Sequence, residues 1–268
     1  MTEVKDLGLE SVLVTDEGDG IYLVTMNRPE RLNALSGGLH EEIITAFQAL
    51  DHNDDCKVIV VTGAGRAFSA GGNVKDWKDK PVGSHVINRA RNDPHHYVDA
   101  MMEIEKPVIA MVNGPAVGQG LMVALWCDIV IAATDARLGD RHINLGLLPG
   151  DGGVVMLPLL LGMHKAKELL LTGDLVSGAE AARLGLVNHA VEPAELKEFT
   201  MTLARKLARQ SPYALKVTKA SLNMIIKRRN LDVFDVAHAL EILTARTNDQ
   251  REAVAAWNEK RDPIWTNT

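Results

Sequence analysis

The chain has 268 residues, of which 46% are hydrophobic and 24% charged, as is usual for a folded globular protein. Its net charge of −6 argues against a general surface for nucleic acid or anionic membrane. The N-terminus has no cationic head followed by an apolar run, and no apolar run approaches the ~20 residues of a membrane helix. The two cysteines suggest neither a metal site nor a disulfide framework. We therefore expect a cytoplasmic protein with no membrane or nucleic-acid partner.

The first half of the chain alternates strands with glycine-rich loops. Residues 11–26, SVLVTDEGDGIYLVTM, predict a β-hairpin, and apolar residues at helical spacing between Leu39 and Leu50 predict a helix. A short buried strand at 58–62 leads into the glycine-rich loop GAGRAFSAGGN. The same pattern, a strand followed by a glycine-rich loop, recurs with a strand at 107–112 and glycine-rich residues at 114–120. This recurrence predicts an α/β protein with loops at one edge of its sheets, where ligands usually bind.

The second half of the chain is mostly helical. Residues 77–91 have no clear period and predict a variable cover, followed by a helix at 94–104. Later helical patterns, interrupted by a short strand within 185–193, cover residues 154–161, 165–171, 178–184, 195–210, 212–229, 231–247 and 251–258. No low-complexity linker separates them. We divide the chain into a core, 1–197, and a C-terminal helical region, 198–268.

The two glycine-rich loops are candidates for binding an anion. The first lacks the Gly-Lys-Ser/Thr ending of a P-loop, and Phe68 replaces the last glycine of a dinucleotide motif. Two interpretations remain: a tight turn, or a loop whose Ala70 N–H stabilises an oxyanion. The second loop opens a helix near Gln119. Because the first N–H groups of a helix have no internal partner, the Gln119 N–H also suits an oxyanion.

A histidine and an aspartate follow the second loop. With an ordinary pKa of ~6.5, His142 suits general-base catalysis, and Asp151 could fix its orientation. The alternative is a surface histidine and a capping aspartate. Asp140 lies two residues before His142 and could equally point to solvent.

Three segments resemble the enoyl-CoA hydratase/isomerase (crotonase) superfamily: GRAFSAGGNVKDW, PVIAMVNGPAVGQGLMVALWCDIVIA and AAWNEKR. The resemblance implies a spiral of β-β-α units with a C-terminal helical region for trimerisation and CoA cover. It also implies an acyl-CoA substrate, a homotrimer or dimer of trimers, and an enolate held by the N–H groups of Ala70 and Gln119. No metal and no cofactor are expected, since coenzyme A is part of the substrate.

The resemblance also implies the residues that contact the substrate. The acyl pocket would include Trp77 and Met122. The coenzyme A contacts would come from the RPERLNAL segment, the first glycine-rich loop and the last helix, namely Arg28, Arg31, Ala67, Ser69, Gly71, Gly72, Asn73, Trp257 and Lys260. For each cation the alternative is a solvated surface charge.

The chain departs from the superfamily at both catalytic glutamates of its hydratases, which are replaced by Met122 and His142. Methionine cannot accept a proton. The segment DRHINLGLLPGDGG is instead similar to the carbon–carbon bond hydrolases of the superfamily, the 6-oxocamphor hydrolase-like branch. There a His–Asp pair activates water to cleave a β-diketone. That branch has a second histidine where this chain has Gln119.

The resemblance and the residues together predict an acyl-CoA-processing enzyme, hydratase/isomerase-like, in which His142 and Asp151 activate water. One alternative is a retro-Claisen hydrolase of a β-diketone or β-keto acyl-CoA. Another is a member that binds acyl-CoA without catalysis. The identity of the acyl group stays open.

Overall fold

The computed structural model describes residues 7–36, 38–74 and 94–268, with only the backbone of 94–96. The predicted cover at 77–91, including Trp77, lies outside the described residues. The helices and strands, in chain order, are β1 Val12–Asp16, β2 Ile21–Met26, η2 Pro29–Arg31, α1 Leu39–Asp51, β3 Val58–Gly63, α3 Pro94–Glu103, β4 Val108–Val112, β5 Ala116–Val117, α4 Gln119–Leu125, β6 Ile129–Ala133, β7 Arg137–Gly139, η4 Ile143–Leu145, α5 Gly153–Leu161, α6 Met163–Thr172, β8 Val176–Ser177, α7 Gly178–Leu184, β9 His189–Val191, α8 Leu196–Ala208, α9 Pro212–Thr244 and α10 Asn248–Glu259.

The strands form two sheets. The larger sheet has the order β1-β2-β3-β4-β6-β9, and the smaller has the order β5-β7-β8. The predicted hairpin is confirmed, since β1 and β2 pair antiparallel, whereas β2, β3, β4, β6 and β9 pair in parallel. Every residue of β3 and β4 is buried, because a central parallel strand is covered on both faces. The predicted α/β class is confirmed.

The parallel strands bring the two glycine-rich loops to the same edge of the large sheet. β3 and β4 are neighbours and run in the same direction. The loop after β3 and the loop after β4 therefore begin side by side. β5 and α4 continue the second loop, and β7 pairs with β5. This topology carries His142, which follows β7, to the same edge.

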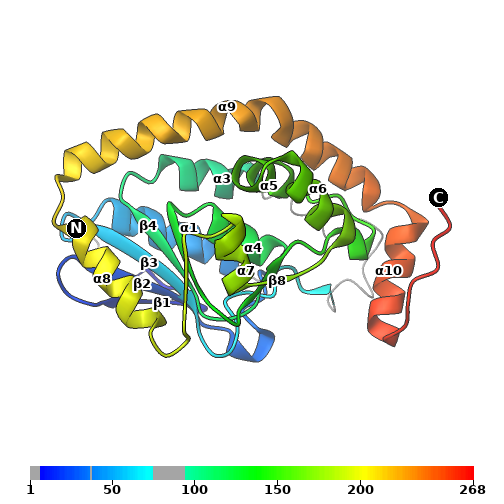
Figure 1. The fold of residues 1–268 in the computed structure, drawn as a ribbon, viewed down its shortest axis with the longest axis horizontal. Helices are drawn as coiled ribbons and strands as arrows, with labels where there is room; N and C mark the ends of the chain where they lie inside the picture. Colours follow the sequence, from blue (N-terminus) through cyan, green and yellow to red (C-terminus); the bar gives the residue numbers. More distant parts are fainter. Residues whose placement is uncertain (1–6, 37, 75–93) are drawn as a thin grey trace.

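Helices α8 and α9 pack differently with respect to the large sheet. α8 packs against β2, β3, β4 and β6, so the predicted boundary at 197/198 lies inside a helix of the core. Figure 1 shows α9 running along the upper side of the molecule, over α3 and α5, which it contacts. The Lys219 ammonium of α9 bonds to the Asp128 carboxylate at 2.7 Å and to the Lys106 carbonyl at 2.8 Å.

One predicted break in this region is wrong. The sequence predicts separate helices at 212–229 and 231–247, but α9 is a continuous helix of 33 residues. Asn230 separates the two patterns without ending the helix, because it is neither proline nor glycine and costs a helix interior only a few tenths of a kcal/mol. The long helix carries its C-terminal half back to the sheet edge that holds the glycine-rich loops.

Candidate active site

The two glycine-rich loops are in direct backbone contact. The Ser69 N–H donates to the Pro115 carbonyl, and the Val117 N–H donates to the Ser69 carbonyl, both at 3.0 Å. A Cβ at Gly71 would lie 2.4 Å from the Val117 carbonyl oxygen, and one at Gly120 would lie 2.4 Å from that of Ser69. Only glycine permits this approach.

Two backbone donors result from this contact, and one differs from the prediction. Gln119 is the first residue of α4, and its N–H has no acceptor among the described residues. The Ala70 N–H, predicted as the second donor, donates instead to the Leu32 carbonyl at 2.9 Å. The Gly72 N–H has no acceptor within the described parts of the chain, and Gly72 lines the same cavity as Gln119. Gly72 therefore replaces Ala70 as the candidate donor of the first loop.

His142 lies between two buried carboxylates. Its Nδ1 is 2.8 Å from Asp140 Oδ1, and its Nε2 is 3.7 Å from Asp151 Oδ2. The His142 backbone N–H also donates to Asp140 Oδ1, at 2.9 Å. Asp140 is only 1% exposed, so it does not point to solvent. The structure thus adds Asp140 to the predicted pair, and its contact with the imidazole is the shorter one.

The surrounding charges decide the protonation state of His142. Burial alone would lower its pKa, but the carboxylates of Asp140, Asp151 and Glu241 together raise it to about 10. The neighbouring carboxylates therefore favour the charged form of the imidazole at neutral pH. The ordinary pKa of ~6.5, on which the prediction of a neutral base depended, does not hold in this environment.

Glu241 was not found from the sequence. It lies on α9, is 1% exposed, and lines the same cavity as His142. His238 Nδ1, one turn earlier, is 3.5 Å from its Oε2. A Cβ at Gly150 would lie 2.6 Å from Glu241 Oε2, which places the loop carrying Asp151 directly against this carboxylate. No local pattern marks this residue, because its role depends on where α9 crosses the core.

The loop carrying Asp151 is held from a second side by Trp126. Gly152 has a φ of +116°, and a Cβ there would lie 2.5 Å from Trp126 Cζ2. The tight fit fixes the backbone next to Asp151. Likewise, a Cβ at Gly118 would lie 3.5 Å from His142 Cε1, so the second glycine-rich loop borders the imidazole.

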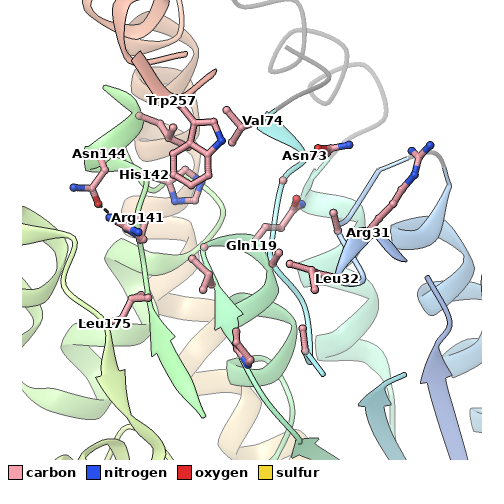
Figure 2. Close-up of a pocket in the computed structure, with 18 of the residues that line it drawn as sticks. Arg31, Leu32, Asn73, Val74, Gln119, Arg141, His142, Asn144, Leu175 and Trp257 are labelled. Carbon is pink, nitrogen blue, oxygen red and sulfur yellow. Dashed lines mark hydrogen bonds between the residues drawn. The ribbon is translucent and has the colours of Figure 1, made fainter. Parts of the chain in front are cut away.

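A cavity of about 660 Å³ opens onto these groups. In Figure 2, His142 and Trp257 lie on one side of it, Arg31 and Asn73 on the other, and Gln119 between them. Of the predicted residues, those that line it are Arg31, Ala67, Ala70, Gly72, Asn73, Gln119, His142 and Trp257. Two further cations that the sequence did not single out, Arg66 and Arg141, line it as well.

The other predicted contacts lie elsewhere. Arg28 donates to the Ser36 carbonyl, the Ser69 hydroxyl donates to the Asn33 carbonyl at 2.8 Å, and Gly71 packs under Val117. Lys260 is exposed at the end of α10. These four residues do not line the cavity. Asp151 and Met122 border a separate small chamber beside Gln119.

Two further properties of the described residues bear on what the site can hold. Ligand atoms of Asp140, His142 and Asp151 lie within 4.8 Å of one another, a spacing compatible with a cation. Both nitrogens of the His142 imidazole already face carboxylates, however, at 2.8 Å and 3.7 Å. That the reaction needs no metal stays a prediction. Within the described parts of the chain, no helix is both long enough and apolar enough to cross a membrane.

Comparisons with known proteins agree with this architecture. The family model for enoyl-CoA hydratase/isomerase matches residues 16–268. A short-chain-enoyl-CoA hydratase of Clostridium acetobutylicum is 36% identical, over 94% of this chain and 96% of that protein. A 1,2-epoxyphenylacetyl-CoA isomerase of Escherichia coli is 34% identical, over 92% and 95%.

Solved structures give the same result. The crystal structure of an enoyl-CoA hydratase/isomerase from Mycobacterium paratuberculosis matches with a TM-score of 0.83 and 35% identity, over 91% of this chain and 97% of that one. The resemblance noted in the sequence is thereby confirmed at the level of the superfamily. With its paired glycine-rich loops and C-terminal helices, the chain belongs to the enoyl-CoA hydratase/isomerase family.

Proposed function

We propose that this enzyme adds water to an acyl-CoA substrate, with a 2-enoyl-CoA as the first candidate. The observation that carries the proposal is an imidazole held between two buried carboxylates, beside two backbone N–H groups that have no acceptor among the described residues. The thioester oxygen would accept hydrogen bonds from Gly72 and Gln119. Such preorganised donors stabilise a developing enolate, and loss of one costs roughly 3–4 kcal/mol. Arg31, Arg66 and Arg141, which line the cavity, would meet the coenzyme A phosphates.

The raised pKa of His142 suggests that the imidazole donates a proton in the reaction and that Asp151 accepts one. The water oxygen attacks the carbon β to the thioester while its proton passes to Asp151. The alkene electron pair moves to the thioester oxygen, forming the enolate. His142 Nε2 then protonates the α-carbon, and the proton on Asp151 recharges the imidazole across the 3.7 Å contact. The product gains the oxygen and both hydrogens of one water. Asp140 holds the ring through Nδ1.

A second candidate is hydrolysis of a carbon–carbon bond in a β-keto acyl-CoA or β-diketone. Met122, buried at 2% exposure, leaves the site without the carboxylate that hydratases of the superfamily carry there. If the β-carbon is a ketone, the same attack gives a tetrahedral alkoxide. Its collapse breaks the α–β bond, releases a carboxylic acid, and leaves an enolate in the same oxyanion site for protonation by His142. Neither reaction involves a redox change, so we propose no cofactor beyond the coenzyme A of the substrate.

The test is a mass-spectrometric screen of 2-enoyl-CoAs, β-keto acyl-CoAs and cyclic β-diketones in ¹⁸O-labelled water. Hydration gives one labelled product, whereas cleavage of an acyl-CoA gives two fragments with the label in the acid, and a cyclic diketone opens to a labelled keto acid. His142→Gln and Asp151→Asn should each lower kcat by roughly 10²–10⁴ with acyl-CoA affinity kept. His164→Gln, at an exposed histidine of α6, is the matched control. Affinity for acyl-CoA without turnover of any substrate would instead support the non-catalytic alternative.

We also propose a homotrimer or dimer of trimers, located in the cytoplasm. Both cysteines are free and buried, which suits a reducing compartment. Exposed apolar side chains along α9 support self-association, among them Leu231 at 82% and Val236 at 61% exposure.

A further inference from the structure

Beside Gln119 lies a second, much smaller chamber with a volume of about 10 Å³. A chamber of roughly this size holds one water molecule, provided that two or more polar groups can bind it. Its polar walls come from three parts of the chain: His40 on α1, Tyr97 on α3, and Gln119 and Asp151 beside the active site. Met122 and two valines complete the wall.

Tyr97 provides the chamber with a buried hydroxyl group. Its side chain is 4% exposed, and its hydroxyl has no hydrogen-bond partner among the described residues. The ring stacks on His40 with a centroid distance of 4.5 Å and an interplanar angle of 29°, which fixes its orientation. Burial raises the pKa of Tyr97 well above its ordinary value, so the hydroxyl stays neutral and can donate. A buried hydroxyl without a partner is costly, and an ordered water removes this cost.

The chamber and the large cavity share a wall. Gln119 lines both, His142 lines only the large cavity, and Asp151 lines only the chamber. The 3.7 Å contact between His142 Nε2 and Asp151 Oδ2 connects the two spaces. A water in the chamber would therefore lie against the carboxylate that the proposed reaction uses as proton acceptor, while the imidazole faces the substrate.

We propose that this chamber binds the reactive water, which donates a hydrogen bond to Asp151 and accepts one from the Tyr97 hydroxyl. Tyr97 would then hold the water in place of the glutamate that Met122 replaces. In the reaction the water oxygen forms its bond to the β-carbon, and the proton facing Asp151 moves to that carboxylate. Tyr97 keeps its own proton throughout. This inference rests on the proposed water addition.

The test compares Tyr97→Phe with Tyr213→Phe, the same change at a tyrosine of α9 that is 74% exposed. We expect Tyr97→Phe to lower kcat about fivefold to thirtyfold, the effect of losing about 1–2 kcal/mol of hydrogen bonding to the reactant, with KM nearly unchanged. Tyr213→Phe should leave both unchanged. A high-resolution crystal structure should show a water within hydrogen-bond distance of Tyr97 Oη and an Asp151 oxygen. Because the change removes only one hydroxyl, thermal melting should confirm that the variant folds.

Three results would overturn the inference while leaving the proposed function intact: an active wild type with an unaffected Tyr97→Phe variant, a rise in KM with kcat unchanged, or acyl carbons filling the chamber in an acyl-CoA complex. A wild type that turns over no substrate of the labelled screen would instead count against the proposed function. Whether the crystal contains the ordered water shows, independently of activity, whether the chamber binds a water molecule.

Discussion

At the scale of single residues, the environment of His142 differs from that of a neutral histidine acting as a general base. Two carboxylates contact one buried imidazole, at 2.8 Å and 3.7 Å, and a third, Glu241, adds to the same field. In a water-poor environment these charges stabilise the imidazolium more than burial destabilises it. This field supports the proposed roles, in which His142 donates a proton and Asp151 accepts one.

This assignment predicts a characteristic pH dependence. Because the pKa of His142 is raised to about 10, kcat/KM should hold from neutral pH upward and fall as the pH approaches and passes 10. The measurement is initial rate against pH, corrected for thioester hydrolysis without enzyme, with His164→Gln as a variant that should keep the profile. An activity that instead rises around pH 6.5, as an ordinary imidazole loses its proton, would assign His142 as a neutral base.

At the scale of elements, the candidate oxyanion site depends on the contact between two loops. β3 and β4 run parallel as neighbours, and the loops that follow them press together at Gly71 and Gly120. The resulting contact sets the spacing between the Gly72 and Gln119 donors. Since both donors are backbone groups, their positions depend on the glycines and not on the donor residues' side chains.

Gly71→Ala should therefore separate the two donors. Its Cβ would lie 2.4 Å from the Val117 carbonyl oxygen and 3.3 Å from the Gln119 nitrogen, so the second loop must move. We expect kcat to fall by roughly 10²–10³, as after the loss of one donor. Gly18→Ala is the matched control, because its φ of +82° resembles the +79° of Gly71 but no atom lies within 4 Å. Both variants carry ~1–2 kcal/mol of backbone strain, and equal activities would show that spacing of the loops is unimportant.

At the scale of the whole molecule, α9 links the core to its surroundings. The ion pair between Lys219 and Asp128 holds the N-terminal half of α9 against the core. The C-terminal half brings Glu241 to the candidate active site. Apolar side chains along the helix are exposed. So many exposed apolar side chains on one helix favour coverage by another surface. The same helix therefore contributes to the candidate active site and to the surface that we propose for self-association.

We expect the wild-type chain to have the mass of three or six chains by light scattering. The double variant Leu231→Asp/Val236→Asp should shift the population towards smaller species, because it puts two charges among the exposed apolar side chains of α9. Leu13→Asp, at a leucine of β1 that is 50% exposed, serves as the control and should keep the wild-type mass. A monomeric wild type, or a double variant of unchanged mass, would contradict assembly through α9.

The sequence by itself determined what depends on neighbouring residues: the hairpin of β1 and β2, the buried strands β3 and β4, the glycine-rich loops, and the choice of His142, Asp151 and Gln119 as candidates. Only the tertiary structure decided contacts between distant segments. The sequence predicted the Ala70 N–H as the donor of the first loop, and only the structure shows that this N–H donates to the Leu32 carbonyl. Asp140 can face solvent or the imidazole, and its 2.8 Å contact follows from the path of the chain after β7. Glu241 and Tyr97 reach the site from α9 and α3 because packing brings those helices there, and no local pattern encodes that approach.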